Sequence, residues 1–443
     1  MIEREKCIEI TKKIKNLIHG LEYEVLITTE EESLTRYANS LIHQNVKSSN
    51  TNIQLRLVDG KKIGIASTNI INDEGLSNLI KKAEEIKNLS EPDSEFNSLP
   101  EPGNIKYPDF EYYDNTDLFD SEEYKAEVVG QICTKAKKTD HKAFGKFSTN
   151  RGELFVSNSN GIESYFKNTY ASLKVQIMSD SDSGYAQVNS KFISDLTTED
   201  VFNEAYETCI RNNHPVAIEP KEYEVILKPE AVNDVLGMLI HMGFSCNSIN
   251  EGNSFLSNKL GEKIFDDKLS ITDDGLNKSG VIMPFDFEGY PKEKIELIRD
   301  GVFTDFVTDS KWSKKLNRRN TGHALPAPNT YGPLPINLII TPGSEILEEM
   351  ISSSSEAILI THFWYSNPLH PKKGLVTGLT RDGTFLVKDG KIDKALKNLR
   401  YTDSFINLLS NIISLGNSLK LCDENLVPAM RCKSLRFTSV APS

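Results

Sequence analysis

The sequence lacks the features that would tie a chain to nucleic acid, a membrane or a secreted compartment. Its 443 residues include 51 lysines and arginines against 63 aspartates and glutamates, which gives a formal charge of −12. An acidic surface of this kind repels phosphate backbones. No apolar run approaches the roughly 18 residues that cross a bilayer, and the N-terminus is an amphipathic segment instead of a signal peptide. We expect a cytoplasmic protein without nucleic-acid or membrane partners.

Cysteine and histidine are too scattered to form a metal site or a disulfide framework by their spacing alone. The six cysteines contain no Cys-x-x-Cys pair, which fits a reducing compartment and argues against a zinc ribbon. The eight histidines are dispersed as well. The chain also lacks the glycine-rich dinucleotide and phosphate-binding motifs and the Gly-x-Ser-x-Gly elbow. The sequence therefore sets aside dinucleotide, P-loop and serine-hydrolase chemistry.

The length and the change in pattern along the chain predict two domains. About 440 residues suffice for two domains that each bury a core. Proline-containing pairs at His214–Pro215 and Glu219–Pro220 separate a half with alternating helices and strands from a strand-rich half. We predict an α+β protein with a mixed α/β N-terminal domain (1–218) and a mainly antiparallel, barrel-like or sandwich-like β domain (219–443).

Three local patterns in the second half predict specific elements. Asp300–Gly301 and Asp389–Gly390 each separate two apolar runs, so each predicts a β-hairpin whose two turn residues have φ > 0. Residues 229–244 are apolar almost all round, which predicts a buried helix. An apolar stripe over residues 405–413 predicts another helix.

Four stretches in order along nearly the whole chain carry a family resemblance. They read TRYANSLIHQN at 35–45, EGNSFL at 251–256, TGHALPAPNTYG at 321–332 and TGLTRDGTFL at 377–386. Each is weak alone, but together they resemble the TldD/PmbA family of peptidases and their partners, long labelled modulators of DNA gyrase.

The resemblance implies two domains and a dimer in which two protomers enclose a cavity. In the catalytic branch of the family, a His-Glu-x-x-x-His helix and a cysteine near the C-terminus bind zinc. That enzyme cuts unfolded peptides, sometimes to mature a peptide natural product. The PmbA, or TldE, branch lacks the helix motif and acts as the partner subunit.

This chain departs from the catalytic branch at the zinc helix. Residues 236–246 read LGMLIHMGFSC, so only His241 remains, Met242 follows it, and Cys246 stands at the second histidine position. A zinc hydrolase needs neutral imidazole ligands and a carboxylate that takes the proton from bound water. Met242 can do neither. We therefore predict a PmbA-like chain with no catalytic residue and no metal of its own, and zinc in a partner subunit.

Two alternative hypotheses assign a catalytic role to the same segment. His241 and Cys246, with Cys422 or Cys432, would form a substitute zinc site, although no carboxylate nearby replaces the missing base. A Cys246 nucleophile would need an imidazole beside it, but positions 241 and 246 of a helix lie about 140° apart around its axis. Core packing of Cys246 is the favoured interpretation, because cysteine is among the most buried residue types.

The proline-rich loop after His323 is the main candidate for contact with peptide. Five prolines between residues 326 and 342 lower the entropy cost of ordering it. By the resemblance, Asn329, Thr330 and Tyr331 lie near the cavity, so we predict that these residues and His323 contact substrate. A rigid structural loop is an equally good interpretation.

Other polar residues in the motifs have weaker assignments. Arg381 pairs either with the C-terminal carboxylate of a substrate or, as we favour, with a buried structural aspartate. Arg36, Asn39 and His43 alternate along a predicted strand, where we favour a dimer contact.

Three functional hypotheses follow. The first is a zinc-free subunit of a metallopeptidase complex that acts on unfolded or precursor peptides, as a homodimer or as a heterodimer with a TldD-like catalytic chain. The second is a stand-alone homodimer that binds or carries peptide without cutting it. The third is an unconventional peptidase in peptide natural-product maturation, built on Cys246 or His323.

Overall fold

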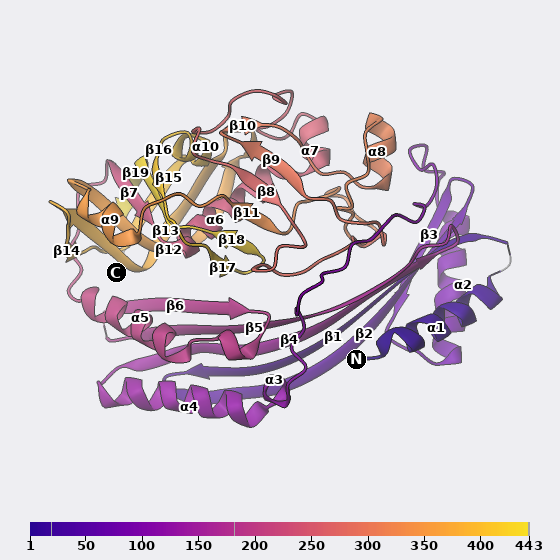
Figure 1. The fold of residues 1–443 in the computed structure, drawn as a ribbon, viewed down its shortest axis with the longest axis horizontal. Coiled ribbons are helices and arrows are strands. Elements are labelled where there is room, and N and C mark those ends of the chain that lie inside the picture. Colours follow the sequence, from indigo (N-terminus) through magenta and orange to yellow (C-terminus); the bar gives the residue numbers. More distant parts are fainter. Residues whose placement is uncertain (19, 181, 442–443) are drawn as a thin grey trace.

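The computed structural model describes residues 1–18, 20–180 and 182–441. A long, bowed sheet carries helices on one side, and a β-rich body lies across its other side (Figure 1). The sheets are largely antiparallel. This is the α+β, two-domain architecture that the sequence predicts, although the exact boundary at 218/219 stays a prediction.

The N-terminal domain is built on one antiparallel sheet with the strand order β3-β2-β1-β4-β5-β6. Its strands are β1 (Glu22–Ala38), β2 (Leu41–Asp59), β3 (Lys62–Thr68), β4 (Lys142–Asn158), β5 (Glu163–Met178) and β6 (Ser183–Ser190). Its helices are α1 (Glu3–Leu17), α2 (Asp73–Leu89), α3 (Asp117–Asp120), α4 (Glu122–Lys138) and α5 (Thr198–Arg211), with a 3-10 turn at Ile193–Asp195.

Strand alternation decides which side chains of this sheet meet the second domain. Successive residues of a strand point to opposite faces. Val25 and Ile27 of β1 therefore pack with α1 and α2, whereas Leu26 packs with Phe285 of the C-terminal domain. The inner face of the long sheet is thus the surface on which the second domain rests.

The C-terminal domain contains a barrel. One sheet runs β12-β7-β19-β15-β13-β14, with β16 on β19, and an additional pairing of β12 with β13 closes five of these strands into a ring. The strands are β7 (Glu222–Leu227), β12 (Glu356–His370), β13 (Leu375–Lys388), β14 (Lys391–Ala395), β15 (Leu399–Ser404), β16 (Ile412–Leu415) and β19 (Met430–Val440). Only the β12–β7 pair of this sheet is parallel, so the predicted antiparallel, barrel-like domain is confirmed.

A second sheet and several short helices complete the domain. This sheet has the order β10-β9-β8-β11-β18-β17. Its strands are β8 (Ile271–Asp273), β9 (Ile295–Arg299), β10 (Val302–Phe303), β11 (Leu338–Ile340), β17 (Lys420–Cys422) and β18 (Asn425–Val427). The helices are α6 (Pro229–Leu239), α7 (Cys246–Asn250), α8 (Ser310–Leu316), α9 (Leu347–Ser352) and α10 (Phe405–Leu409), with a π-helical turn at Ile240–Phe244 and a 3-10 turn at Pro371–Lys373.

The local predictions have different outcomes. Both Asp-Gly hairpins are confirmed, with φ of 48° and 77° at Asp300 and Gly301 and of 49° and 76° at Asp389 and Gly390. The apolar helix of residues 229–244 is buried as expected, but its last turn is π-helical. The helix over residues 405–413 is wrong: α10 ends at Leu409 and the chain turns into strand β16.

None of the helices in the described ranges is long and apolar enough to cross a membrane.

Candidate functional site

The segment at the zinc-helix position separates the side chains that a metal would need together. The π-helical turn places Met242 in the core, with 2% of its surface exposed. His241, one residue earlier, is exposed to solvent. The chain then bends at Ser245, which caps the short helix α7, and Cys246 is fully buried. His241 and Cys246 therefore face different environments.

The Cys246 thiol is held in an unreactive state. Its Sγ accepts a hydrogen bond from Asn250 Nδ2 at 3.4 Å. Burial raises the pKa of the Cys246 thiol to about 12. A nucleophile or zinc ligand acts as the thiolate, so this site works against both roles. Burial likewise raises the pKa values of Cys422 and Cys432.

The proline-rich loop is hydrogen-bonded to the start of helix α7. Ser245 Oγ donates a hydrogen bond to the Tyr331 carbonyl, and Asn247 Nδ2 donates to the Thr330 carbonyl at 3.0 Å. Gly332 has φ +74°, and a Cβ there would lie 2.1 Å from Asn247 Oδ1. The approach of loop and helix thus requires glycine at position 332.

A cleft of about 720 Å³ lies between the two domains beside this loop. The N-terminal domain lines it with Arg56, Ile63, Ile65 and parts of residues 93–98, and the C-terminal domain lines it with Asn247, Glu251 and parts of residues 309–315 and 324–332. We refer to this space as the interdomain cleft. Its size is within the range of ligand sites, roughly 300–1,000 Å³.

The structure places three of the predicted loop residues at or beside the cleft. Asn329 and Thr330 line it. The Asn329 side chain is also used within the loop, because its Oδ1 accepts from the Tyr331 N–H at 2.8 Å and its Nδ2 donates to the Gly332 carbonyl at 3.2 Å. Tyr331 is 61% exposed. Thr330 and Tyr331 therefore present free surface, while Asn329 also holds the turn.

His323 lies below the loop and presents no surface to a peptide. Its side chain is fully buried, with Nε2 3.1 Å from Asp273 Oδ1. Its Nδ1 lies 2.9 Å from the Thr321 carbonyl. Lys292 Nζ lies 3.1 Å from the same Asp273 oxygen, and burial lowers the pKa of His323. This is a structural cluster, so we do not retain His323 as a contact to substrate or as a catalytic group.

Arg381 lies away from the cleft, on β13 of the barrel. Its guanidinium stacks over the Trp364 ring at 3.6 Å from the ring centroid, and its Nε lies 3.8 Å from Asp382 Oδ2. The nearby carboxylate is thus a structural aspartate, the alternative that the sequence favours.

The floor of the cleft contains charged residues that sequence reasoning missed. Arg56 Nε lies 3.4 Å from Glu24 Oε1, and Arg56 Nη1 lies 3.7 Å from Glu288 Oε1. Burial raises the pKa of Glu24 to about 7, and burial with the charge of Glu288 raises that of Asp309 to about 6. A charged residue at an inward position of a strand was the available signal for Arg56, but nothing in the sequence linked it to residues 288 and 309.

The comparisons with known proteins agree with this architecture. The model of the PmbA/TldA metallopeptidase C-terminal domain matches residues 220–439, and that of PmbA/TldA metallopeptidase domain 1 matches residues 23–87. Together the two models match more than half of the chain.

The chain belongs to the PmbA/TldA metallopeptidase family.

Relatives of this PmbA/TldA chain carry both names of the family. Metalloprotease PmbA of Escherichia coli O157:H7 is 23% identical over 436 residues, 93% of this chain and 92% of that protein. A metalloprotease TldD homologue of Haemophilus influenzae is 22% identical over 390 residues, 83% of this chain and 80% of that protein. The crystal structure of TldE from Thermococcus kodakarensis matches with a TM-score of 0.87 at 19% identity, over 98% of this chain and all of that one. At that identity the structural likeness shows the fold.

The family name raises the question whether this PmbA/TldA chain can hold a catalytic metal. In residues 1–18, 20–180 and 182–441, no three His, Cys, Asp or Glu side chains come together in a way that could hold a metal ion. The weak candidates His241 and Cys246 do not converge, as shown above. The donor set of this segment therefore does not fit zinc, and no hydrolytic step can be built on it.

Proposed function

We propose that this chain is the non-metal-binding subunit of a PmbA/TldD-type metallopeptidase complex that acts on unfolded or precursor peptides. One observation carries the proposal: the segment 241–246 offers an exposed imidazole, a buried thioether and a buried thiol in place of two zinc-binding imidazoles and a carboxylate. A thioether cannot accept the proton of a zinc-bound water. The metal and the general base would come from a TldD-like partner chain.

In this proposal the interdomain cleft contributes to peptide binding. The loop beside it is anchored to α7 by hydrogen bonds from Ser245 and Asn247, so the Thr330 side chain sits on a rigid support. Binding surfaces that are ordered in advance lose less entropy when a ligand arrives. The chain would thus shape the peptide site without performing the chemistry.

The same proposal assigns the exposed end of the β1–β2 hairpin to the contact between subunits. Arg36, Asn39 and His43 are all exposed there, and Leu41 and Ile42 beside them are exposed as well, at 61% and 40%. Exposed apolar residues with polar neighbours are typical of interaction surfaces.

The experiment uses the chain alone and mixed with a TldD-like chain from the same genome. We expect no cleavage of an unfolded peptide by this chain alone, co-elution of the two chains, and chelator-sensitive cleavage by the mixture. Thr330→Arg should raise the KM of the mixture for peptide several-fold. Thr134→Arg, on the exposed side of α4, is the matched control and should leave KM unchanged.

Two results would contradict the proposal. Chelator-sensitive cleavage by this chain alone would show that it has its own metal site. Tight peptide binding by a dimer of this chain, with no response to any TldD-like chain, would instead support a stand-alone peptide carrier.

A further inference from the structure

A smaller pocket lies on the opposite side of α7 from the interdomain cleft. Its volume is about 320 Å³. Asn247 and Glu251 of the α7 region face the cleft, whereas Ile249 and Asn250 face this pocket. Asn247 and Ile249 are two positions apart on the helix and therefore point in nearly opposite directions. The two cavities have no lining residue in common, so they are separate sites.

The pocket has apolar walls and a polar mouth. Ile249, Leu256, Phe303 and Phe306 form walls that are at most 7% exposed. Leu260 lies at the mouth and is 48% exposed. A volume near the lower end of the range for ligand sites, roughly 300–1,000 Å³, suits one apolar side chain better than a longer segment.

Arg318 brings a cationic group with free N–H donors to this mouth. Its guanidinium stacks on Phe306, 4.2 Å from the ring centroid, and Nη2 donates to Asp305. A guanidinium has five N–H donors in a planar fork. Within the described residues, Nη2 is the one guanidinium nitrogen of Arg318 with a protein acceptor. Since Nη2 carries two N–H groups, one edge of the guanidinium with two neighbouring N–H groups stays available to a carboxylate.

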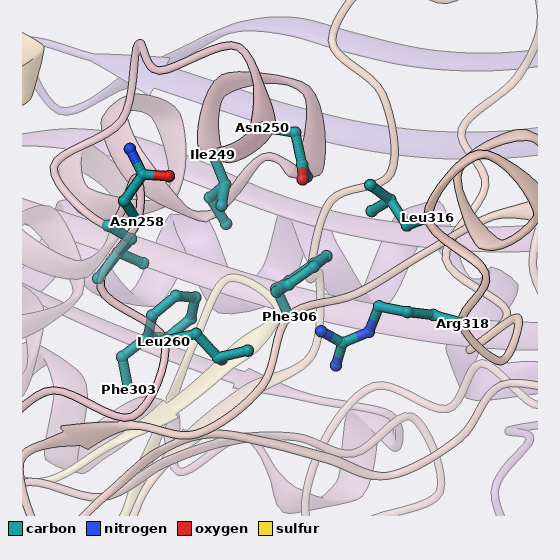
Figure 2. Close-up of a pocket in the computed structure, with 9 residues that line it drawn as sticks. Ile249, Asn250, Asn258, Leu260, Phe303, Phe306, Leu316 and Arg318 are labelled. Atoms are coloured by element: carbon teal, nitrogen blue, oxygen red, sulfur yellow. The ribbon is translucent and has the colours of Figure 1, made fainter.

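Two carboxamides lie across from this guanidinium (Figure 2). Asn250 Nδ2 donates to the Cys246 carbonyl at 2.8 Å, which leaves Asn250 Oδ1 free to accept a hydrogen bond. The Asn258 side chain makes no hydrogen bond with any residue that the structure describes. An acceptor, a second carboxamide and a forked cation thus surround one apolar space.

We propose that this pocket binds the carboxyl-terminal residue of a peptide when that residue is aromatic or large and aliphatic. The side chain enters the apolar space, the terminal carboxylate pairs with the free donors of Arg318, and Asn250 Oδ1 accepts the last backbone N–H. Arg is suited to this role because its fork matches a carboxylate with two parallel hydrogen bonds. The inference rests on the proposed function only in taking a peptide as the occupant.

Asp305, the carboxylate that already pairs with Arg318, has a second cationic partner. It also binds Arg319, whose Nη2 lies 2.7 Å from Asp305 Oδ2. Arg318 can therefore turn its remaining donors to a ligand while Asp305 keeps a partner. The same arrangement makes a matched pair of variants, because Arg319 binds the same aspartate but does not line the pocket.

The experiment measures binding to the purified full chain alone by calorimetry, with no cleavage involved. The probes are a glycine-serine pentapeptide that ends in phenylalanine with a free carboxylate, the same peptide as a C-terminal amide, and 3-phenylpropionate. We expect the free acid to bind at least tenfold more tightly than the amide and than 3-phenylpropionate. Arg318→Leu should weaken free-acid binding about tenfold, as for loss of a charge-assisted hydrogen bond, and leave the amide unchanged.

The controls separate the pocket from the fold and from the proposed function. Arg319→Leu should bind the free acid like the unaltered chain, and Leu260→Trp, which fills the mouth, should weaken binding of every probe. Equal binding of acid and amide, no effect of Arg318→Leu, or equal binding of 3-phenylpropionate would each overturn the inference. The proposed function fails on a different result, cleavage by this chain alone.

Discussion

The two ends of the interface between the domains are built differently. At one end, near α5 and β12 (Figure 1), Asp382 is buried and both its oxygens are satisfied. Its Oδ1 accepts from Gln176 at 2.8 Å and Ser183 at 2.6 Å, and its Oδ2 accepts from His362 at 2.9 Å. At the other end, near β3 and α8, the same pair of domains leaves the interdomain cleft, where Arg56 lies between Glu24 and Glu288 and where Asp309 is also part of the lining.

This difference indicates which end holds the domains together and which can bind a ligand. We call the first end, formed by Gln176, Ser183, His362 and Asp382, the interdomain seam. Both ring nitrogens of His362 face acceptors, since Nδ1 lies 3.0 Å from the Phe363 carbonyl, so a doubly protonated imidazolium satisfies both. A buried polar network that is fully paired fixes a geometry, whereas carboxyl groups with raised pKa values beside open space, such as Asp309, are typical of functional sites.

The largest expected effect comes from breaking the seam. Asp382→Ala removes the acceptor of three donors and leaves the largely buried His362 ring without its carboxylate partner. Removing one partner of a buried pair costs about 3 kcal/mol or more. We expect a loss of that size in the free energy of unfolding, measured in urea. Asp393→Ala, at an exposed position of β14, should change it by no more than about 0.5 kcal/mol; equal effects of the two variants would show that the seam does not hold the domains.

The next effect is a pH dependence that originates at the cleft. The folded-state pKa values of Glu24 and Asp309, about 7 and about 6, lie above their unfolded values of about 4.3 and 3.9. A carboxyl with a raised folded pKa contributes stability that is fully present below its unfolded pKa and lost as the pH rises through the folded one. Stability should therefore fall between about pH 4 and pH 7.

Glu24→Gln should reduce this loss of unfolding free energy by roughly 2 kcal/mol, because the amide has no proton to lose. The check is urea unfolding at pH 4.5, 6 and 7.5. Glu22→Gln, at an exposed position of the same strand, should give a curve parallel to that of the unaltered chain. A Glu24→Gln curve that is also parallel would show that Glu24 is ionised throughout.

A smaller effect tests whether the loop beside the cleft must be held against α7. Gly332 and Gly252 have nearly the same φ, +74° and +76°, but a Cβ meets Asn247 only at position 332. Alanine in this conformation costs about 1 kcal/mol at either position. Of the two variants, we expect only Gly332→Ala to weaken binding of an unfolded peptide, by several-fold, in a titration of the full chain. The same loss in Gly252→Ala would mean that the fixed position of the loop is not needed.

What the sequence could predict was local. The Asp-Gly hairpins depend on adjacent residues, and both were predicted correctly. The prediction of a helix over residues 405–413 was wrong. Over so short a stretch, apolar residues at helical spacing can continue into strand residues without breaking the pattern. The pairing of β16 with β19 determines that residues 412–415 form a strand. The family motifs singled out Thr330, which the structure places at the interdomain cleft; its contact with peptide stays a prediction.

What the sequence could not predict depends on tertiary contacts between distant residues. Arg56 and Glu288 meet only because the inner face of the N-terminal sheet packs on the second domain. The burial of His323 could not be seen either, since its neighbours in sequence are polar and proline-rich while Asp273, its partner, lies 50 residues earlier. Pattern alone does not show which polar residue of a loop points inward.

The smallest expected effect separates the two arginines that sequence and structure connect with carboxylates. Arg381 already stacks on Trp364 and lies near Asp382, at the seam and away from the cleft. Such a half-exposed cation–π contact contributes about 0.5–1 kcal/mol, so Arg381→Leu should lower the free energy of unfolding by no more than that. Peptide binding should be unchanged in calorimetry, in contrast to Arg318→Leu. If Arg381→Leu instead abolished peptide binding while stability stayed the same, the substrate carboxylate would lie at the seam, and the contrast between a structural and a binding end would be reversed.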